Sequence, residues 1–393
     1  MRIANARLAD GNLCDIDVAA GRIAALVAAS GAPATGDDID LGGALVLPPL
    51  VDGHIHLDKT LLGLPWVPNQ STGDRVIDRI EAERRVRAQR TVPEFETGSN
   101  LVRQVVANGT LHLRSHVDID AELGLRNLHE VLKIRERFRD LVTIQIVAFP
   151  QGGILRSPGT AELLDAAIAE GADLVGGLDP AGIDGDMDGH LNVVFSIAAR
   201  RGVGVDIHLH DGGERGLVQM QAIAERSRAL GMQGKVAISH AFALGSASAD
   251  RAARTCDPLG EAQIAIMSHG PGGAPMPPLK LLAEHGVRLF AGSDNIRDAW
   301  SPFGNGDMLE RTMMIAYRAN FRHDRELLAT LDMATGGAAS VLGVPDYGLQ
   351  PGHPADLVAV DAPSPVEAIV ARPRRRLVMK AGRVVARDGS FVG

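Results

Sequence analysis

The sequence predicts a (β/α)8 barrel with a small β-sandwich beside it, and two observations carry that prediction. Eight short apolar runs, rich in valine and isoleucine, alternate with segments of helical periodicity. Several runs begin at a glycine where the preceding helix should end, as at Gly109 and Gly171. Strands that are apolar throughout are typical of a parallel sheet covered on its outer face, and closure into a barrel is the simplest arrangement. A doubly wound open sheet is the alternative.

The expected barrel strands are separated by segments such as 160–170, which has apolar residues at i, i+3, i+4 and i+7. The strands are expected at 44–53, 109–117, 141–149, 171–178, 202–209, 234–238, 263–267 and 286–292.

Both ends of the chain have a different pattern. Runs such as 21–27 and 376–385 alternate with a period of two, and no long helical segment accompanies them. Chain termini often lie close together, so we expect the two ends to pair into one β-sandwich. The predicted domains are a sandwich of residues 1–48 with 346–393 and a catalytic barrel of residues 49–345.

Composition excludes several classes of protein. The 393 residues are 45% hydrophobic, enough for a large core, and a net charge of -8 argues against a nucleic-acid partner. Cys14 and Cys256 form no disulfide framework, which favours a reducing compartment. No apolar run approaches the ~18 residues of a membrane span, and the first residues lack the apolar core of a signal peptide. We therefore expect a cytoplasmic protein without a membrane partner.

The first barrel strand ends in His54-Ile55-His56. Side chains at i and i+2 of a strand point to the same side, so both imidazoles emerge together. A single pair of this kind is weak evidence for a metal site, because histidines also occur as hydrogen-bonded core residues.

Polar side chains recur where later strands end, which is where barrel enzymes carry their reactive groups. A lone histidine is explained equally well as a hydrogen-bonded group in a polar barrel mouth. Recurrence on four strands, with an aspartate on the last, favours a divalent metal site. The residues are Gln151, His208, His210, Asp211, His240, His269, Asp294 and Asn295.

The roles follow from what a metal hydrolase needs. His54, His56 and His208 are the expected nitrogen ligands, and Asp294 is the oxygen ligand. The metal lowers the pKa of bound water toward ~7, so hydroxide is available to attack the substrate. Asp294 would also accept a proton, and His240 would orient the hydroxide. The chain has five lysines and none lies in 171–179, where a lysine bridging two metals is expected, so we predict one metal per chain.

Several motifs together resemble the amidohydrolase superfamily, and within it the cytosine deaminase group. They are Pro48 to Asp58, Asn69 to Ser71, Leu113 to Asp118, Ile144 to Ile154, Ser239-His240 and Ser293 to Pro302. The resemblance implies a barrel with a flanking sandwich, iron or zinc as the metal, and hydrolytic release of ammonia from a nitrogen heterocycle. It implies the same metal ligands, an outer-sphere role for His240, and a substrate-amide contact for Gln151.

The chain departs from that group in ways that bear on substrate. Asp211 stands where cytosine deaminases have a glutamate that moves a proton onto the ring, and Asn295 stands where an aspartate is usual. His269 and Lys59 also replace typical residues. These changes make the pocket less anionic and favour a carbonyl-rich or partly anionic ring. Lys59 is explained equally well by an ion pair with Asp58 or a loop carboxylate.

Three residues keep two interpretations each. Trp66 and Trp300 follow ligand-bearing strands and are expected to stack on a planar ring, although core filling explains a tryptophan as well. Asp211 is either a proton shuttle or a cap for the helix that follows. With Gln151, His269 and Asn295, the tryptophans complete the expected substrate contacts.

The leading hypothesis is an aminohydrolase (deaminase) of a cytosine-like heterocycle, with homo-oligomerisation left open. The alternatives are an alkylamino-triazine hydrolase of the N-isopropylammelide kind and a cyclic-amide hydrolase, whose usual bridging lysine is absent. A non-catalytic scaffold is disfavoured because His54, His56, His208, His240 and Asp294 are all present.

Overall fold

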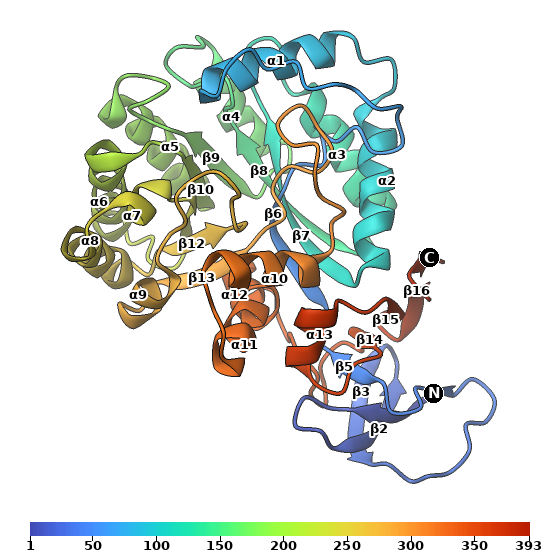
Figure 1. The fold of residues 1–393 in the computed structure, drawn as a ribbon. Helices are drawn as coiled ribbons and strands as arrows, with labels where there is room; N and C mark the ends of the chain where they lie inside the picture. Colours follow the sequence, from blue (N-terminus) through green and yellow to red (C-terminus); the bar gives the residue numbers. More distant parts are fainter.

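A computed structural model describes residues 1–393 and contains the predicted barrel (Figure 1). Eight parallel strands follow one another in chain order around the sheet. A parallel bridge between Ile55 and Asp294 joins the first strand to the segment after the last, so the sheet closes and the open-sheet alternative is wrong. The strands are β6 Leu50–Ile55, β7 Thr110–Asp118, β8 Thr143–Phe149, β9 Leu174–Leu178, β10 Gly204–Leu209, β11 Val236–His240, β12 Ala265–Ser268 and β13 Arg288–Ala291.

The first predicted strand, 44–53, is divided between two sheets. β5 (Leu45–Leu47) belongs to the terminal sheet, and the barrel strand β6 begins only at Leu50. Pro48 and Pro49 separate the two strands, because proline has no N–H to donate to a ladder. The expectation of one continuous strand is therefore wrong.

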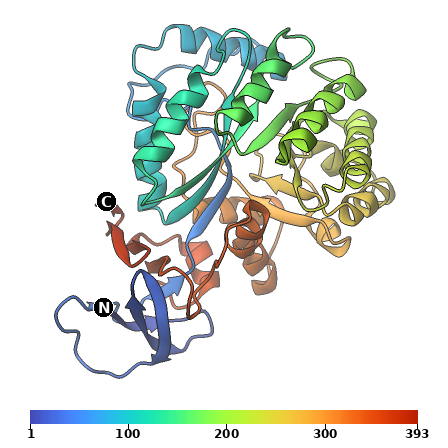
Figure 2. The ribbon, with the colours of Figure 1, turned by 180° about the vertical axis from the view of Figure 1, so that it is seen from behind.

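Helices cover the outside of the barrel (Figure 2). The helices of the chain are α1 Val76–Ala88, α2 Glu94–Ala107, α3 Arg126–Arg137, α4 Thr160–Ala169, α5 Met187–Arg201, α6 Gly213–Ala229, α7 Phe242–Ser246, α8 Ala249–Glu261, α9 Leu279–Glu284, α10 Met308–Arg318, α11 Asp324–Asp332, α12 Gly336–Leu342 and α13 Pro365–Ala371. Of these, α1 lies at the end of the barrel and α13 lies beside the terminal sheet (Figure 1). None of these helices combines the length and the hydropathy that crossing a membrane requires.

The flanking β-structure expected from both chain ends is confirmed (Figure 2). Its nine strands form one mixed sheet around a separate core of 14 buried residues, and β5 and β14 pair across the two ends. The exact domain boundaries at 48 and 346 stay a prediction. The remaining strands are β1 Arg2–Arg7, β2 Leu13–Ala19, β3 Arg22–Ala28, β4 Ile39–Asp40, β14 Leu357–Val360, β15 Arg375–Lys380, β16 Arg383–Arg387 and β17 Ser390–Phe391.

Candidate metal centre and substrate cavity

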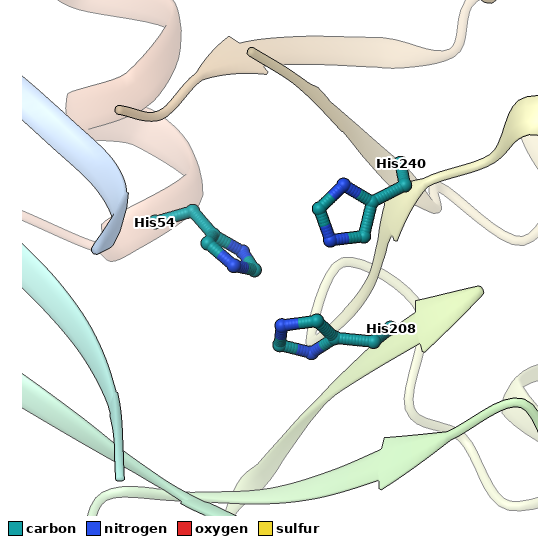
Figure 3. Close-up of side chains that lie close together, drawn as sticks. All are labelled: His54, His208 and His240. Carbon is teal, nitrogen blue, oxygen red and sulfur yellow. The ribbon is translucent and has the colours of Figure 1, made fainter. Parts of the chain in front are cut away.

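The predicted ligands meet at one end of the barrel. His54 and His56 come from the end of β6, His208 from β10, and Asp294 follows β13. One carboxylate oxygen, Asp294 Oδ1, lies 3.3 Å from His56 Nε2 and 3.5 Å from His54 Nε2. Figure 3 shows His54, His208 and His240 pointing toward one another, and each of the three offers a nitrogen within 4.8 Å of the others.

Hydrogen bonds behind the site orient two of the imidazoles. Nδ1 of His54 donates to Ser239 Oγ at 2.9 Å, and that hydroxyl donates in turn to Asp206 at 2.8 Å. Nδ1 of His56 donates to the carbonyl of His116 at 3.1 Å. A proton on Nδ1 leaves the Nε2 lone pair of each ring free, and both Nε2 atoms face the Asp294 carboxylate.

Buried nitrogens without hydrogen-bond partners mark the same place. They include Nε2 of His54, both ring nitrogens of His208, both of the neighbouring His116, and Nε2 of His240. Leaving such groups buried and unpaired is costly, so a cluster of them indicates a missing partner. Three imidazoles and one carboxylate form a donor set that suits zinc or iron, and a divalent metal would satisfy Nε2 of His54 and one ring nitrogen of His208. The residues therefore fit the metal that the sequence predicts.

The protonation states also suit a metal. Burial lowers the pKa of His56, His208 and His240, so these rings are neutral near pH 7. Burial works against ionisation of Asp294, yet the surrounding histidines, His54 and His56 foremost, hold the pKa of the carboxyl well below its usual range. Neutral imidazoles beside a carboxylate are the forms that bind a divalent cation.

The backbone at the centre is strained. His240 has φ 76° and Asp294 has φ 60°, both in the left-handed region that residues other than glycine rarely adopt. Such strain persists only where the surroundings enforce it, and it concentrates at functional sites. Here it occurs at His240, where β11 ends, and at the expected ligand Asp294, in the loop after β13.

A cavity of about 1230 Å³ opens in front of the centre. Four predicted substrate contacts line it, namely Gln151, His269, Asn295 and Trp300. Trp66 does not line the cavity, and it is 64% exposed. The stacking role predicted for Trp66 gains no support from this position, since an exposed loop side chain does not reach the metal centre.

Asp211 also lies outside the cavity lining. Its Oδ2 accepts from Gln219 Nε2 at 2.9 Å, and its backbone N–H donates to Asp179. Helix α6 begins after Gly212 without a side-chain cap, so the alternative capping role is absent as well. The carboxylate instead ties α6 to the loop after β9, and the shuttle role assigned to Asp211 gains no support from its position.

His210, to which the sequence analysis assigned no role, lies inside the site. Its ring lines the cavity, stacks on His240 with centroids 4.4 Å apart, and bonds Asp179 Oδ2 through Nδ1 at 2.8 Å. Burial opposes a charge on the ring, but Asp179 raises the pKa of His210. The spacing of two from His208 was the available signal, because both side chains leave the strand on one side.

A buried network holds Gln151. Lys59 Nζ donates to Gln151 Oε1, and Gln151 Nε2 donates to Glu83 Oε2 at 2.5 Å. Lys59 pairs with Asp118 at 3.0 Å, whereas Asp58 accepts from the backbone N–H of Asp118. The ion pair with Asp58 weighed from the sequence is therefore replaced by one with Asp118, and Lys59 lines the cavity as well.

Helix α1 was absent from the sequence prediction of the site. It lies at the end of the barrel away from the terminal sheet (Figure 1), and Ile80 packs against Phe149 and Leu178 at the ends of β8 and β9. Glu83 lies in a strongly charged segment, 81–85, which predicts a solvated helix face. No local feature of the sequence distinguishes the buried carboxylate of Glu83 from the other charged side chains of this segment.

Comparison with known proteins gives a family and close relatives. The model of a family described as the amidohydrolase family matches residues 37–386. An N-isopropylammelide isopropyl amidohydrolase from Pseudomonas sp. (strain ADP) is 34% identical, covering 91% of this chain and 89% of the relative. The crystal structure of an N-isopropylammelide isopropylaminohydrolase from Burkholderia multivorans matches with TM-score 0.95 and 45% identity, covering 100% and 99% of the two chains. That of a 5-methylcytosine deaminase from Klebsiella pneumoniae matches with TM-score 0.89 and 28% identity over 98% and 97%.

Proposed function

The chain belongs to the amidohydrolase family and is a hydrolase of carbon–nitrogen bonds, and we propose that it releases an alkylamine from an oxo-substituted triazine of the N-isopropylammelide kind. The expected residues of a one-metal site support the hydrolytic part of this proposal. His54, His56 and Asp294 form one group of possible ligand atoms within 4.8 Å of one another, and His54 and His208 share a second group with His240. From these groups, His54, His56, His208 and Asp294 would hold the ion. A bound divalent ion supplies a nucleophile at neutral pH by lowering the pKa of water.

The chain's own groups supply proton handling around the attacked carbon. Asp294 Oδ2 lies 3.9 Å from His269 Nδ1, which lies 3.4 Å from His240 Nδ1. Burial lowers the pKa of His269 to about 4, so its neutral ring can accept a hydrogen bond as well as donate one. We assign Asp294 to take the proton of the attacking water and to pass it to the departing nitrogen as the C–O bond forms and the C–N bond breaks, and His240 to orient that water.

The orientation of Gln151 is the observation that carries the substrate class. Lysine only donates and a carboxylate only accepts, so Lys59 and Glu83 fix which end of the Gln151 amide is the oxygen. One N–H and one lone pair of that amide remain for substrate. They complement a ring edge with neighbouring C=O and N–H groups, which oxo-triazines and oxo-pyrimidines such as cytosine both present.

Three further features favour an alkylamine over ammonia as the leaving group. A cavity of about 1230 Å³ exceeds the ~300–1,000 Å³ usual for small-molecule sites, which leaves room for an N-alkyl substituent. The centroid of the Phe242 ring lies 5.4 Å from that of His240 and 6.2 Å from that of His269. An apolar ring therefore lies beside the reacting groups. Asp211, which would protonate a cytosine ring, is engaged with Gln219 instead.

A substrate panel tests the proposal. Purified enzyme is incubated with N-isopropylammelide, cytosine, 5-methylcytosine and a pterin, and released amine or ammonia is measured by mass spectrometry. His208→Ala protein, prepared identically, reports contaminating activity. We expect isopropylamine from N-isopropylammelide with the highest kcat/KM of the panel. Faster release of ammonia from cytosine or the pterin would overturn the assignment and restore the deaminase hypothesis.

A further inference from the structure

We propose that Glu83 of helix α1 is a positioning residue that fixes three substrate-facing side chains through one carboxylate oxygen. Oε2 of Glu83 accepts from Gln151 Nε2 at 2.5 Å and from the indole N–H of Trp300, and it lies 3.5 Å from Lys59 Nζ. These partners come from the loops after β8, β13 and β6, and all three line the cavity. Glu83 itself does not line it, so it acts through its partners.

The charge of Glu83 matters as much as its shape. Burial opposes ionisation, but Lys59 and Arg87 lower the pKa of the carboxyl, so it is an anion at neutral pH. An anion accepts from all three partners at once, because each of them is a donor. A neutral amide in the same place would present one end as a donor. With its oxygen kept toward the three partners, the donor end would face Arg87, which lies 3.8 Å from Oε1 of Glu83, and no negative charge would remain to hold Lys59.

The same carboxylate holds α1 against the barrel mouth. Lys59 Nζ lies 5.5 Å from the Trp300 ring and 5.2 Å from the Phe149 ring, so the anion, the cation and both aromatic rings form one packed unit. Only 7% of the surface of Glu83 is exposed, so water does not replace a lost bond. Weakening this unit would free the Gln151 amide to rotate and the Trp300 ring to tilt.

The consequence for turnover rests on the proposed function, because it concerns how an oxo-triazine edge is held. Glu83 contacts none of the expected metal ligands, so its removal should leave metal content unchanged. The net stabilisation from a hydrogen bond to a charged group corresponds to roughly a ten- to hundredfold change in a binding or folding equilibrium constant. We therefore expect Glu83→Gln to lower kcat/KM by that factor, mainly through a higher KM.

A measurement without substrate tests the contact directly. The chain has two tryptophans, so ¹⁵N-tryptophan labelling gives two indole resonances, and Trp300→Phe identifies the one from Trp300. Trp66 is 64% exposed and serves as the internal reference. In the wild-type protein the Trp300 indole proton should lie downfield and exchange slowly with solvent. Glu83→Gln should move it upfield and leave the Trp66 resonance in place.

Glu81→Gln is the matched control, because Glu81 is an exposed carboxylate on the same helix. It should leave both resonances and kcat/KM at their wild-type values. A wild-type Trp300 indole proton that exchanges as fast as that of Trp66 would overturn the proposal, even if Glu83→Gln does not fold. So would a Glu83→Gln protein with the indole resonance and KM of the Glu81→Gln control. If no panel compound reacts, the proposed function fails while the indole measurement still decides the role of Glu83.

Discussion

Replacing Ser239 with alanine should weaken metal binding without touching a metal ligand. The Ser239 hydroxyl accepts the Nδ1 proton of His54 at 2.9 Å and donates to Asp206, which also pairs with Arg114 at 3.0 Å. Without the hydroxyl, the Nδ1–H of a fully buried imidazole has no partner, and the ring loses the bond that fixes its tautomer.

The expected magnitude follows from that single bond. Outer-sphere partners of metal-bound histidines typically change metal affinity by about ten- to hundredfold, or roughly 1.4–2.8 kcal/mol. His54 is buried, so water cannot enter to restore the bond, and we expect the upper half of this range. The assay is titration of apoprotein with Zn(II) in competition with a chelating dye.

Ser268→Ala supplies the control for this measurement. Ser268 is an equally buried serine at the end of the neighbouring strand β12, and its hydroxyl accepts only from the backbone N–H of Gly270, at 3.3 Å. It should bind Zn(II) as the wild-type protein does. If Ser239→Ala binds Zn(II) as tightly as Ser268→Ala, the orientation argument for His54 is refuted.

Two further variants follow from contacts away from the metal. Asp211→Asn should lower the melting temperature but leave kcat nearly unchanged, because the carboxylate bonds Gln219 rather than lining the cavity; a kcat loss of about 10²-fold or more would restore the shuttle role. Burial raises the pKa of Asp298 to about 7, so the folded chain holds a proton there that the unfolded chain releases near pH 4. This contribution to stability is present below pH 4 and is lost as pH rises to 7, by up to about 1.4 kcal/mol per pH unit. Urea unfolding of Asp298→Asn should lack that slope, and an unchanged slope contradicts the assignment.

Much of the barrel could be read from the sequence because its signals are local. Apolar runs that end at polar residues, with glycines such as Gly109 and Gly171 before them, mark strands regardless of what they pack against. The error at 44–53 has the same origin. A continuous apolar run does not show that β5 and β6 belong to different sheets, because that depends on where the other end of the chain pairs.

The metal ligands could also be predicted from the sequence, because the strand ends of a barrel converge regardless of the loop conformations. The arrangement of the residues around the cavity could not be predicted in this way. Trp66 and Trp300 are indistinguishable as loop tryptophans, yet one is exposed and the other bonds Glu83. Glu83, in turn, looks like any charge on a solvated helix. Its burial arises from α1 packing on β8 and β9, a tertiary contact that no helical pattern encodes.

We expect amine release to require one divalent ion, held by His54, His56, His208 and Asp294. Apoprotein prepared with a chelator and titrated with Zn(II) or Fe(II) tests it most directly, with isopropylamine release from N-isopropylammelide measured at each step. Activity should rise in proportion to added metal and reach its plateau at one ion per chain, and His208→Ala should stay inactive throughout. Full activity in the metal-free protein, or a plateau only at two ions per chain, would contradict the account.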